Sequence, residues 1–327
     1  AVKNGKNVFL LTSRLSQHRA AVETLKMIRK SGDFKAVDII GKKHLCSQDV
    51  ADMDSSMFSN FCQTLVKEKQ CKFYTNSSVM NTVADRNGIV RILSTQISSP
   101  EESMRLASAR YCTYEILMDA ARRADVVVGD YFHLFGMGDR FLKRMGKNIS
   151  DSIIIVDEAH NLSSRLRDYM SATLTTRSCK LAAKEAEKFG ASEVSDMATG
   201  VSSVLTSLAK KSLVTKNESF ILKEELIDRI NATDNYDVII ERMTELGRRV
   251  LEERKVSHSD RVAGFLHSWK RGDLGYARIL SRQRIHSEDH IALQFSCLDP
   301  SLISKEIIAS SHSTILMSGT LRPVEMH

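Results

Sequence analysis

The sequence has few of the residues that mark linkers, disulfide scaffolds and membrane spans. Only three prolines occur in 327 residues, which excludes Pro-rich linkers. No apolar run approaches the roughly 18 residues needed to cross a bilayer, and no opening segment resembles a signal peptide. Six cysteines are too few for a disulfide scaffold in a chain of this length. The composition, 42% hydrophobic and 27% charged, is that of an ordinary globular protein of about two domains.

A phosphate-binding loop of the form Gly-x-x-x-x-Gly-Lys-Ser/Thr is also missing from these residues. Without the backbone amides and the lysine of such a loop, no segment is suited to hold the β- and γ-phosphates of a nucleotide. The chain opens on AVKNGKNVFLLTSR, with no initial methionine, and enters an apolar run almost at once. We therefore expect that the true beginning of a domain has been cut away.

Short apolar runs predict the buried strands of a parallel sheet. Each run is followed by polar or small residues, where an α/β sheet places its ligand-binding loops. The runs are NVFLL at 7–11, DVVVG at 125–129, SIIIV at 152–156 and TILM at 314–317.

Apolar stripes at helical spacing predict helices with buried faces. Val22, Leu25 and Ile28 form such a stripe after the first strand, and the segment from about 165 to 265 is strongly helical. Alternation over HIALQFSC at 290–297 predicts a strand with Cys297 in the core. Two further stripes are expected to be core and not a cofactor site: Val194, Met197, Val201, Val204 and Leu208, and Ile239, Met243, Leu246 and Val250.

The stretch SIIIVDEAHNL places Asp157 and Glu158 at the carboxyl end of a predicted strand. An aspartate there can hold the Mg²⁺ that bridges the β- and γ-phosphates, and a neighbouring glutamate can position and deprotonate water. His160 would reach toward a neighbouring segment that couples the nucleotide site to another domain. Taken alone, the tetrapeptide DEAH at 157–160 is also compatible with a surface Asp-Glu pair at a strand end.

A second predicted strand ends in MSGTL, where small hydroxyl residues can sense the state of a nucleotide site. The three residues after its apolar part are Ser318, Gly319 and Thr320. IIIVDEAHNL resembles motif II of DEAH-box helicases, and MSGTL resembles their motif III. FLLTSR is similar to motif Ia, which in that family contacts single-stranded DNA through its backbone and corresponds here to Thr12, Ser13 and Arg14.

With its cysteines, the chain resembles the XPD-type DNA helicases of the iron–sulfur branch of superfamily two. The resemblance implies an α/β fold, with a RecA-like parallel-sheet motor domain that carries an inserted iron–sulfur cluster domain and an inserted helical Arch domain. The expected order is motor domain with motif Ia at 1–40, cluster domain at 41–122, motor domain with motif II at 123–164, Arch at 165–265 and motor domain with motif III at 266–327.

Four cysteines fall between residues 46 and 112, separated by 15, 8 and 40 residues. No C-x-x-C pair occurs, so spacing alone does not separate a cluster from zinc or from four unrelated thiols. The contexts GKKHLC, CKFY and YCTY are similar to those that hold a [4Fe–4S] cluster in the XPD family. The family commonly has proline where this chain has Thr113. This difference removes no ligand, so Cys112 is still expected to be the fourth one. The expected ligands are Cys46, Cys62, Cys71 and Cys112.

The resemblance places the cluster domain beside the DNA path. Lys72 and Tyr74 are then expected to offer a phosphate contact and a stacking face, and packing around the cluster is the alternative. Tyr131, just beyond a strand end, is expected to touch DNA, with a packing role as its alternative. Residues 248–284 hold ten Lys/Arg and four acids, which predicts a DNA-facing surface or a solvated charged one.

For the complete protein the resemblance implies an ATP-dependent helicase that uses Mg²⁺, moves 5′ to 3′ on single-stranded DNA and unwinds duplex in DNA repair, such as nucleotide excision repair. Expected partners are single-stranded and forked DNA and repair-complex proteins, with no membrane. The protein is expected to be monomeric and intracellular, in a prokaryotic or archaeal cytoplasm or a eukaryotic nucleus. This polypeptide alone is expected not to hydrolyse ATP. The alternative is a non-motor iron–sulfur module for DNA binding or damage recognition.

Overall fold

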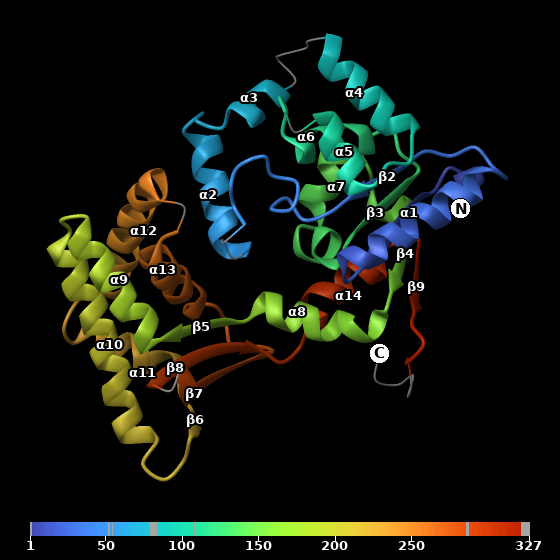
Figure 1. Cartoon of the computed structure of the whole chain (residues 1–327). Helices are drawn as coiled ribbons and strands as arrows, with labels where there is room; N and C mark the ends of the chain where they lie inside the picture. The colour runs from blue at the N-terminus through green and yellow to red at the C-terminus, as the bar shows by residue number, and fades with distance from the viewer. Residues whose placement is uncertain are drawn as a thin grey trace. The chain divides into compact units, whose positions relative to one another are not determined.

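The structure, a computed structural model, describes residues 2–51, 53, 55–78, 84–107, 109–254, 256–285 and 288–321 (Figure 1). The chain divides into two compact units. Unit 1 comprises residues 1–51, 66–169 and 300–327, and unit 2 comprises residues 52–65 and 170–299.

Unit 1 is an α/β layer structure. Its strands are β1 (Asn7–Thr12), β2 (Ala36–Ile39), β3 (Val126–Asp130), β4 (Ser152–Asp157) and β9 (Ser313–Met317). Its α-helices are α1 (Leu15–Arg29), α3 (Lys72–Ser77), α4 (Ala84–Thr95), α5 (Pro100–Ala107), α6 (Thr113–Ala121), α7 (Asp139–Met145), α8 (Leu162–Met170) and α14 (Ser301–Ser310). Short helical turns are η1 (Val2–Asn4), the π-helical η2 (Phe132–Gly136), η3 (Ile149–Asp151) and η4 (Ala159–Asn161).

The strands of unit 1 form a parallel sheet in the order β2-β3-β1-β4-β9. The strands expected at 7–11, 125–129, 152–156 and 314–317 are present, each to within one residue at either end. The expected burial of the last strand is wrong: Ile315, Leu316 and Met317 are 48%, 36% and 46% exposed, because β9 is the edge strand of the sheet. Because all five strands run in the same direction, their carboxyl ends lie at one edge of the sheet. The predicted α/β class and RecA-like parallel sheet are therefore confirmed.

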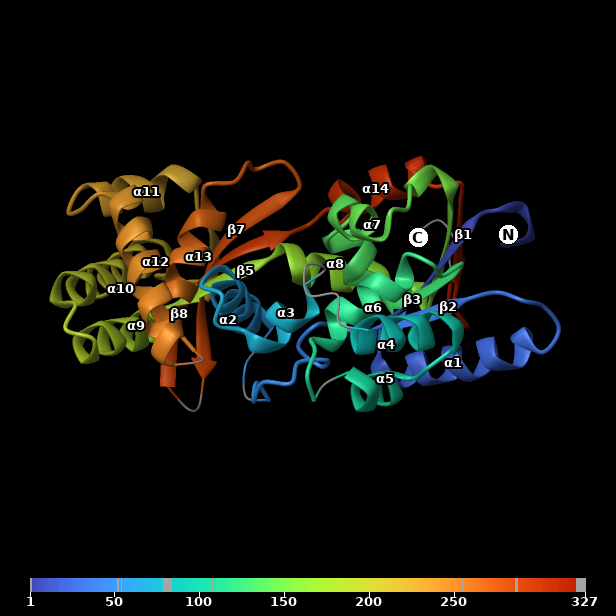
Figure 2. The ribbon, with the colours of Figure 1, turned by 90° about the horizontal axis from the view of Figure 1, so that it is seen from above.

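Both faces of this sheet are covered by helices, as Figure 2 shows for α1 and α7 on opposite sides of the strands. Val8 and Val128 pack with Val22 and Leu25 of α1 on one face. Ile28, expected on the same stripe, is instead 52% exposed because the buried face of α1 ends at Leu25. On the other face, a larger cluster is built from the sheet and α6 and α7, including Phe9, Leu11, Leu117 and Phe141.

The helices between residues 84 and 121 share the core of the sheet. Val90 and Leu93 of α4 and Ile116 of α6 belong to the same buried cluster as Phe9 of β1. The expected cluster domain at 41–122 is thus divided in the structure: residues 52–65 belong to unit 2 and the remainder to unit 1. This division follows packing, because α4 and α6 bury their apolar faces against the sheet.

Unit 2 combines a helical layer with an antiparallel sheet. Its helices are α2 (Ser55–Lys67, largely in this unit), α9 (Thr176–Lys188), α10 (Ser192–Ser212), α11 (Lys223–Asn231), α12 (Tyr236–Glu253) and α13 (His258–Trp269). Its strands, in the order β5-β8-β7-β6, are β5 (Ala172–Thr175), β6 (Glu218–Phe220), β7 (Tyr276–Ile285) and β8 (Glu288–Cys297).

The helical stripes of unit 2 form its core, as the sequence predicts. Met197 on α10 and Met243 on α12 are 7% and 0% exposed and lie in one apolar cluster. Cys297 is 3% exposed and Cys179 is fully buried, and burial raises the pKa of the Cys179 thiol to about 12. Within the described ranges, no helix has the length and apolarity that a membrane crossing needs.

The hairpin β7–β8 belongs to unit 2, whereas the sequence placed all of residues 266–327 in the motor domain. Two contacts explain the difference. β5 pairs with β8 immediately before the helical segment begins, and Leu280, Leu293 and Phe295 of the hairpin pack into the helical core. The chain returns to unit 1 at Pro300, not near residue 266.

A buried ion-pair network ties α1 to β2 and β3. His18 Nδ1 lies 2.5 Å from Asp38 Oδ1, and His18 Nε2 lies 3.2 Å from Asp130 Oδ1. Burial acts to lower the pKa of His18, but the hydrogen bonds and negative charges of Asp130 and Asp38 outweigh it and raise the pKa to about 9. His133, which accepts the backbone N–H of Asp130, is buried, and burial lowers its pKa to about 4.

This network predicts a pH-dependent contribution to stability. The folded pKa of His18 lies above its unfolded value, so the contribution is complete below about pH 6.5 and is lost as pH rises through about 9. We expect the difference in unfolding free energy between wild type and His18→Gln to shrink by on the order of 2 kcal/mol across that window. Urea unfolding from pH 6 to pH 9.5 measures it, with the exposed His312→Gln as control. A difference that stays constant with pH contradicts the assignment.

Candidate functional site

The segments predicted to be functional begin at one edge of the parallel sheet. In the strand register, Thr12 at the end of β1 pairs with Asp130 at the end of β3, and Asp157 of β4 pairs with Met317 of β9. β1 and β4 are themselves neighbours, with Leu11 opposite Val156. The loops after Thr12, Asp130, Asp157 and Met317 therefore leave the sheet side by side.

At this edge a hydrogen-bond network joins motif II to motif III. The Ser318 hydroxyl donates to Glu158 Oε2 at 2.9 Å, and His160 Nδ1 lies 2.7 Å from the same hydroxyl. His160 Nδ1 is also 3.2 Å from Glu158 Oε2. Thr320 Oγ1 lies 3.3 Å from Ser318 Oγ, and Gly319 between them is exposed. The structure thus brings together side chains that are 160 residues apart in the chain.

Glu158 has an unusual backbone. Its φ of 49° and ψ of 47° place a non-glycine residue in the left-handed region, which costs on the order of 1–3 kcal/mol and persists only where neighbours enforce it. The Glu158 N–H donates to Asp157 Oδ1 at 2.9 Å, and the Glu158 carbonyl accepts the Asn161 N–H at 2.9 Å. Such strain is common at functional sites, and here it turns the Glu158 side chain toward Ser318.

Asp157 and Glu158 are half-buried at the end of a rigid strand. Asp157 uses Oδ1 within the protein, and no protein hydrogen bond to its Oδ2 occurs in the described ranges. Across those ranges, no group of three or more His, Cys, Asp or Glu side chains suited to a metal ion is assembled. A single carboxylate oxygen fits Mg²⁺ all the same, because Mg²⁺ on nucleotides is usually held by one or two carboxylates, phosphates and water.

The segment Thr12–Arg14 is fixed by a side chain that the sequence did not single out. Gln17 Oε1 accepts the N–H of Ser13 at 3.0 Å, the N–H of Arg14 at 2.9 Å and the Ser13 hydroxyl at 3.2 Å. Thr12 is 1% exposed, Ser13 is half-buried and Arg14 is exposed. Only the Arg14 side chain of the three is fully presented at the surface.

Tyr131 lies beneath motif II. It is 3% exposed, and its hydroxyl donates to the carbonyls of Asp157 and Glu158, the latter at 2.9 Å. Burial raises its pKa to about 12. The expected DNA contact is replaced in this structure by the alternative, a supporting role inside the protein. The sequence could not signal this, because the direction of a phenol depends on the packing of strands far apart in the chain.

The candidate DNA-binding residues of α3 differ in exposure. Lys72 is exposed, and its Nζ lies 5.2 Å from the centroid of the Phe73 ring. Tyr74 is half-buried, and Lys42 Nζ lies 5.9 Å from the centroid of its ring. Both positions therefore combine a cation with an aromatic face, the pairing that suits phosphate and base contacts as well as local packing.

The four candidate cluster cysteines are all half-buried thiols. Cys71 precedes α3 and Cys112 precedes α6, and the Cys112 N–H donates to the Phe73 carbonyl at 3.1 Å and to the Ser77 hydroxyl at 2.8 Å. These bonds join the segments that carry Cys71 and Cys112. Cys46 lies in the turn after β2 in the same unit, whereas Cys62 lies in α2 and belongs to unit 2.

The basic stretch 248–284 is partly used inside unit 2. Arg278 is 5% exposed, forms an ion pair with Asp273 and lies 5.0 Å from the centroid of the Trp269 ring. Lys270 Nζ lies 2.7 Å from Asp237 Oδ1. Arg278 therefore stabilises the core and is unavailable to DNA. Lys255 and the side chain of Arg284, two further members of the stretch, lie outside the described residues.

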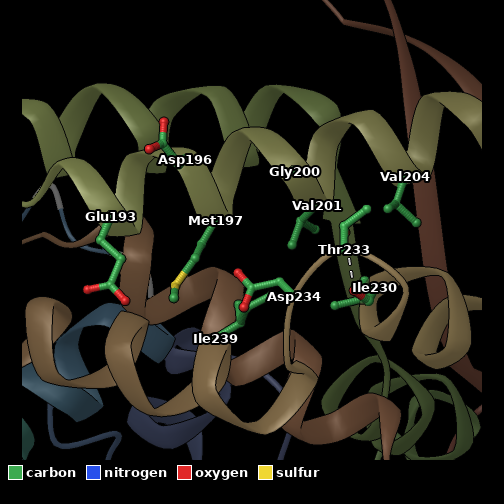
Figure 3. A pocket seen from close by; sticks show the side chains of 10 residues that line it. All are labelled: Glu193, Asp196, Met197, Gly200, Val201, Val204, Ile230, Thr233, Asp234 and Ile239. Carbon is green, nitrogen blue, oxygen red and sulfur yellow. Dashed lines mark hydrogen bonds between the residues drawn. The ribbon is translucent and has the colours of Figure 1, made fainter.

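Unit 2 also contains a shallow hollow between α10 and the segment joining α11 to α12 (Figure 3). Its volume is about 320 Å³. The side chains of Glu193 and Asp234 point toward it, and its floor is apolar. It contains none of the predicted site residues, so it is separate from the edge where motifs Ia, II and III meet.

Several known proteins are similar to this chain. The ATP-dependent DNA helicase CHL1 of Eremothecium gossypii is 24% identical over 350 residues, which cover 97% of this chain and 41% of that protein. The CHL1 of Kluyveromyces lactis is 29% identical over 154 residues, covering 46% of this chain and 18% of that protein. A regulator of telomere elongation helicase 1 homolog of Anopheles gambiae is 25% identical over 240 residues, which cover 72% of this chain and 23% of that protein. The chain spans less than half the length of these curated relatives.

A solved structure described as truncated XPD has the same fold. It aligns with a TM-score of 0.59 and 17% identity, covering 98% of this chain and 83% of that one. The family model DEAD_2 matches residues 11–179, just over half of the chain. The match contains motif Ia, the four clustered cysteines, Tyr131 and motif II. Because this match covers more than half of the chain, the chain is a member of the DEAD_2 family.

Proposed function

We propose that this chain belongs to an ATP-dependent DNA helicase and supplies the water-activating half of its ATP site. The observation that carries the proposal is the network of Glu158, Ser318 and His160 at the carboxyl edge of the sheet. It agrees with the names of the relatives, which are ATP-dependent DNA helicases and a telomere-elongation helicase homolog. A second domain and a phosphate-binding loop of the full-length protein would complete the site.

In this proposal each residue of the network has one role. Asp157 would hold the magnesium ion, which would supply positive charge to neutralise the phosphates. Glu158 accepts a hydrogen bond from the attacking water and orients it. Ser318 donates to Glu158 and fixes the direction of its carboxylate, and His160 holds Ser318 from the other side. Loss of the γ-phosphate would then change the position of motif III through Ser318.

DNA binding is proposed for two places in unit 1, the segment 12–14 after β1 and the helix α3. Arg14 and Lys72 are exposed cations, and Tyr74 offers part of an aromatic face. Exposed cations bind phosphates without reading sequence, which suits an enzyme that moves along a strand. We extend the proposal to 5′ to 3′ movement on single-stranded or forked DNA and to a role in DNA repair. Both follow from the resemblance to XPD-type helicases.

A [4Fe–4S] cluster is proposed on Cys46, Cys62, Cys71 and Cys112. All four are thiols, all are half-buried, and hydrogen bonds join the segments of Cys71 and Cys112. Thiolate is the ligand that such clusters use. The described arrangement does not gather three of these thiols into one group, so the cluster has no role in the steps above.

The rate of ATP hydrolysis tests the role of Glu158. In the full-length protein, Glu158→Gln should lower the kcat for ATP by about a hundredfold or more, since it removes the group that positions the water. The KM for ATP should change little. Steady-state hydrolysis with saturating oligothymidylate measures both quantities. Glu241→Gln, an exposed glutamate of α12, is the matched control and should behave as wild type. Full activity of the Glu158→Gln protein would remove Glu158 from the mechanism.

The iron content of the protein tests the proposed cysteine ligands. Anaerobically purified full-length protein should be brown and contain about four iron atoms per chain. Cys71→Ser and Cys112→Ser should each lose most of the iron, whereas Cys297→Ala, in the core of unit 2, should retain it. Colourless wild-type protein with one zinc per chain would overturn the ligand assignment.

A further inference from the structure

The hollow in unit 2 has an apolar floor that three helices hold in place. Met197 and Val201 of α10 line it from one side, and Ile230 of α11 and Ile239 of α12 line it from the other (Figure 3). Each of these side chains is 7% exposed or less and belongs to the core of unit 2. The volume of about 320 Å³ lies at the lower end of the range of about 300–1,000 Å³ for small-molecule pockets. It suits one or two inserted side chains.

Gly200 keeps this hollow open. It lies in the interior of α10, where glycine is less favourable than any residue except proline, and it lines the hollow. A Cβ at Gly200 would meet no packed neighbour within 4 Å, whereas a Cβ at Gly247 of α12 would lie 2.7 Å from the Cβ of Asp260. Close packing therefore requires Gly247 but not Gly200. A larger side chain at Gly200 would instead take up space in the hollow.

Two carboxylates face the hollow without a cation to balance them. Glu193 of α10 and Asp234, in the segment between α11 and α12, point toward it from its two sides (Figure 3). Asp234 Oδ1 accepts the Asn235 N–H at 2.7 Å. Among the described residues that line the hollow there is no Lys, Arg or His, although the chain has a net charge of +7. The dipole of α10 favours Glu193 in its first turn, but it supplies no cation to Asp234.

An occupant of the hollow must combine a cation with apolar surface. Lys and Arg side chains have this construction, because their aliphatic stems cover apolar surface while the charged head reaches a polar group. Their hydrogen bonds to carboxylates are charge-assisted and stronger than neutral ones. Nucleotides and the phosphates of DNA carry the same sign of charge as Glu193 and Asp234 and are repelled.

We propose that this hollow is the docking site for a segment of a partner protein in which Lys or Arg lies next to an aliphatic or aromatic side chain. The cation binds Glu193 or Asp234, and the neighbouring apolar side chain covers the floor beside Gly200. A peptide segment is favoured over a free small cation because only the peptide also removes the apolar floor from water. The inference goes beyond the function proposed above, since it uses no residue of the ATP site.

The test is a selection of short random peptides on the full-length wild-type protein, followed by fluorescence polarisation of the recovered peptides. Gly200→Leu fills the hollow and should weaken at least one family of these peptides by about tenfold or more. The peptides of that family should carry Lys or Arg next to an aliphatic or aromatic residue. If no recovered peptide is weakened by Gly200→Leu, or if those weakened lack such a pair, the inference is wrong.

Gly264→Leu is the matched control. Gly264 is also a helix-interior glycine of unit 2, in α13, where an added Cβ meets no packed neighbour within 4 Å, and it does not line the hollow. Both substitutions replace a helical glycine by a good helix former, so neither should lower the thermal stability. Gly264→Leu should leave peptide binding as in wild type. Equal loss of binding in both variants would contradict the inference.

A charge test keeps the shape of the hollow. Glu193→Gln combined with Asp234→Asn should weaken the same peptides by about tenfold, because the charge-assisted contacts are lost. Asp228→Asn combined with Glu241→Gln changes the net charge equally at two exposed acids of unit 2 outside the hollow, and should leave binding unchanged. Equal weakening by both pairs would show general charge attraction and overturn the inference.

Other occupants of the hollow give different results. Binding of spermidine that Gly200→Leu abolishes, without an effect on any peptide, would assign the hollow to a small cation. A dimer of the full-length protein that Gly200→Leu dissociates would assign it to a second copy of this chain. Either result contradicts the inference. DNA-stimulated ATP hydrolysis should be unchanged in Gly200→Leu, so a failure of the proposed function, which Glu158→Gln tests, is seen separately.

Discussion

The hydrogen-bond register of the parallel sheet in unit 1 is the constraint on which the site depends. Because β1, β3, β4 and β9 run in the same direction, their carboxyl ends lie along one edge, and each loop begins beside the next. The segments that carry Ser13, Tyr131, Glu158 and Ser318 leave the sheet there, although they are spread over most of the chain. A one-residue slip in any of these strands would turn its side chains to the opposite face and break the set.

Around that edge, the fold holds costly groups in place with hydrogen bonds. The left-handed Glu158 is held by Tyr131 and by its own bonds to Asp157 and Asn161. The ion pair of His18 with Asp38 lies almost fully buried behind motif Ia. Buried charges require partners, so this pair fixes α1 against β2 and β3 more strictly than apolar contacts alone would. Rigidity behind the loops leaves the loops themselves as the parts that can respond to ligands.

Much of the fold could be predicted because its signals are local. Continuous apolar runs of four or five residues predict buried parallel strands, and the strand at 126–130 follows that rule, with its first four residues buried. Asp157 and Glu158 could be predicted as site residues because they come at the end of an apolar strand. The burial of Cys297 could likewise be predicted from strand periodicity.

Other features depend on contacts between distant segments. His18 and Asp38 look like surface residues until α1 is laid on the sheet, and Arg278 looks like part of a basic surface until the ring of Trp269 covers it. The extent of unit 2 depends on the pairing of β5 with β8, which are more than a hundred residues apart. Nor does the sequence indicate that a glutamine at position 17 holds motif Ia.

The most direct test of the central claim is a structure of the full-length protein with single-stranded DNA, Mg²⁺, ADP and fluoroaluminate as a mimic of the transferred phosphate. The account predicts that Asp157 and Glu158 face the fluoroaluminate, with Ser318 still bonded to Glu158 and Tyr131 still bonded to the backbone of residues 157 and 158. A nucleotide bound away from the carboxyl edge of this sheet would contradict it.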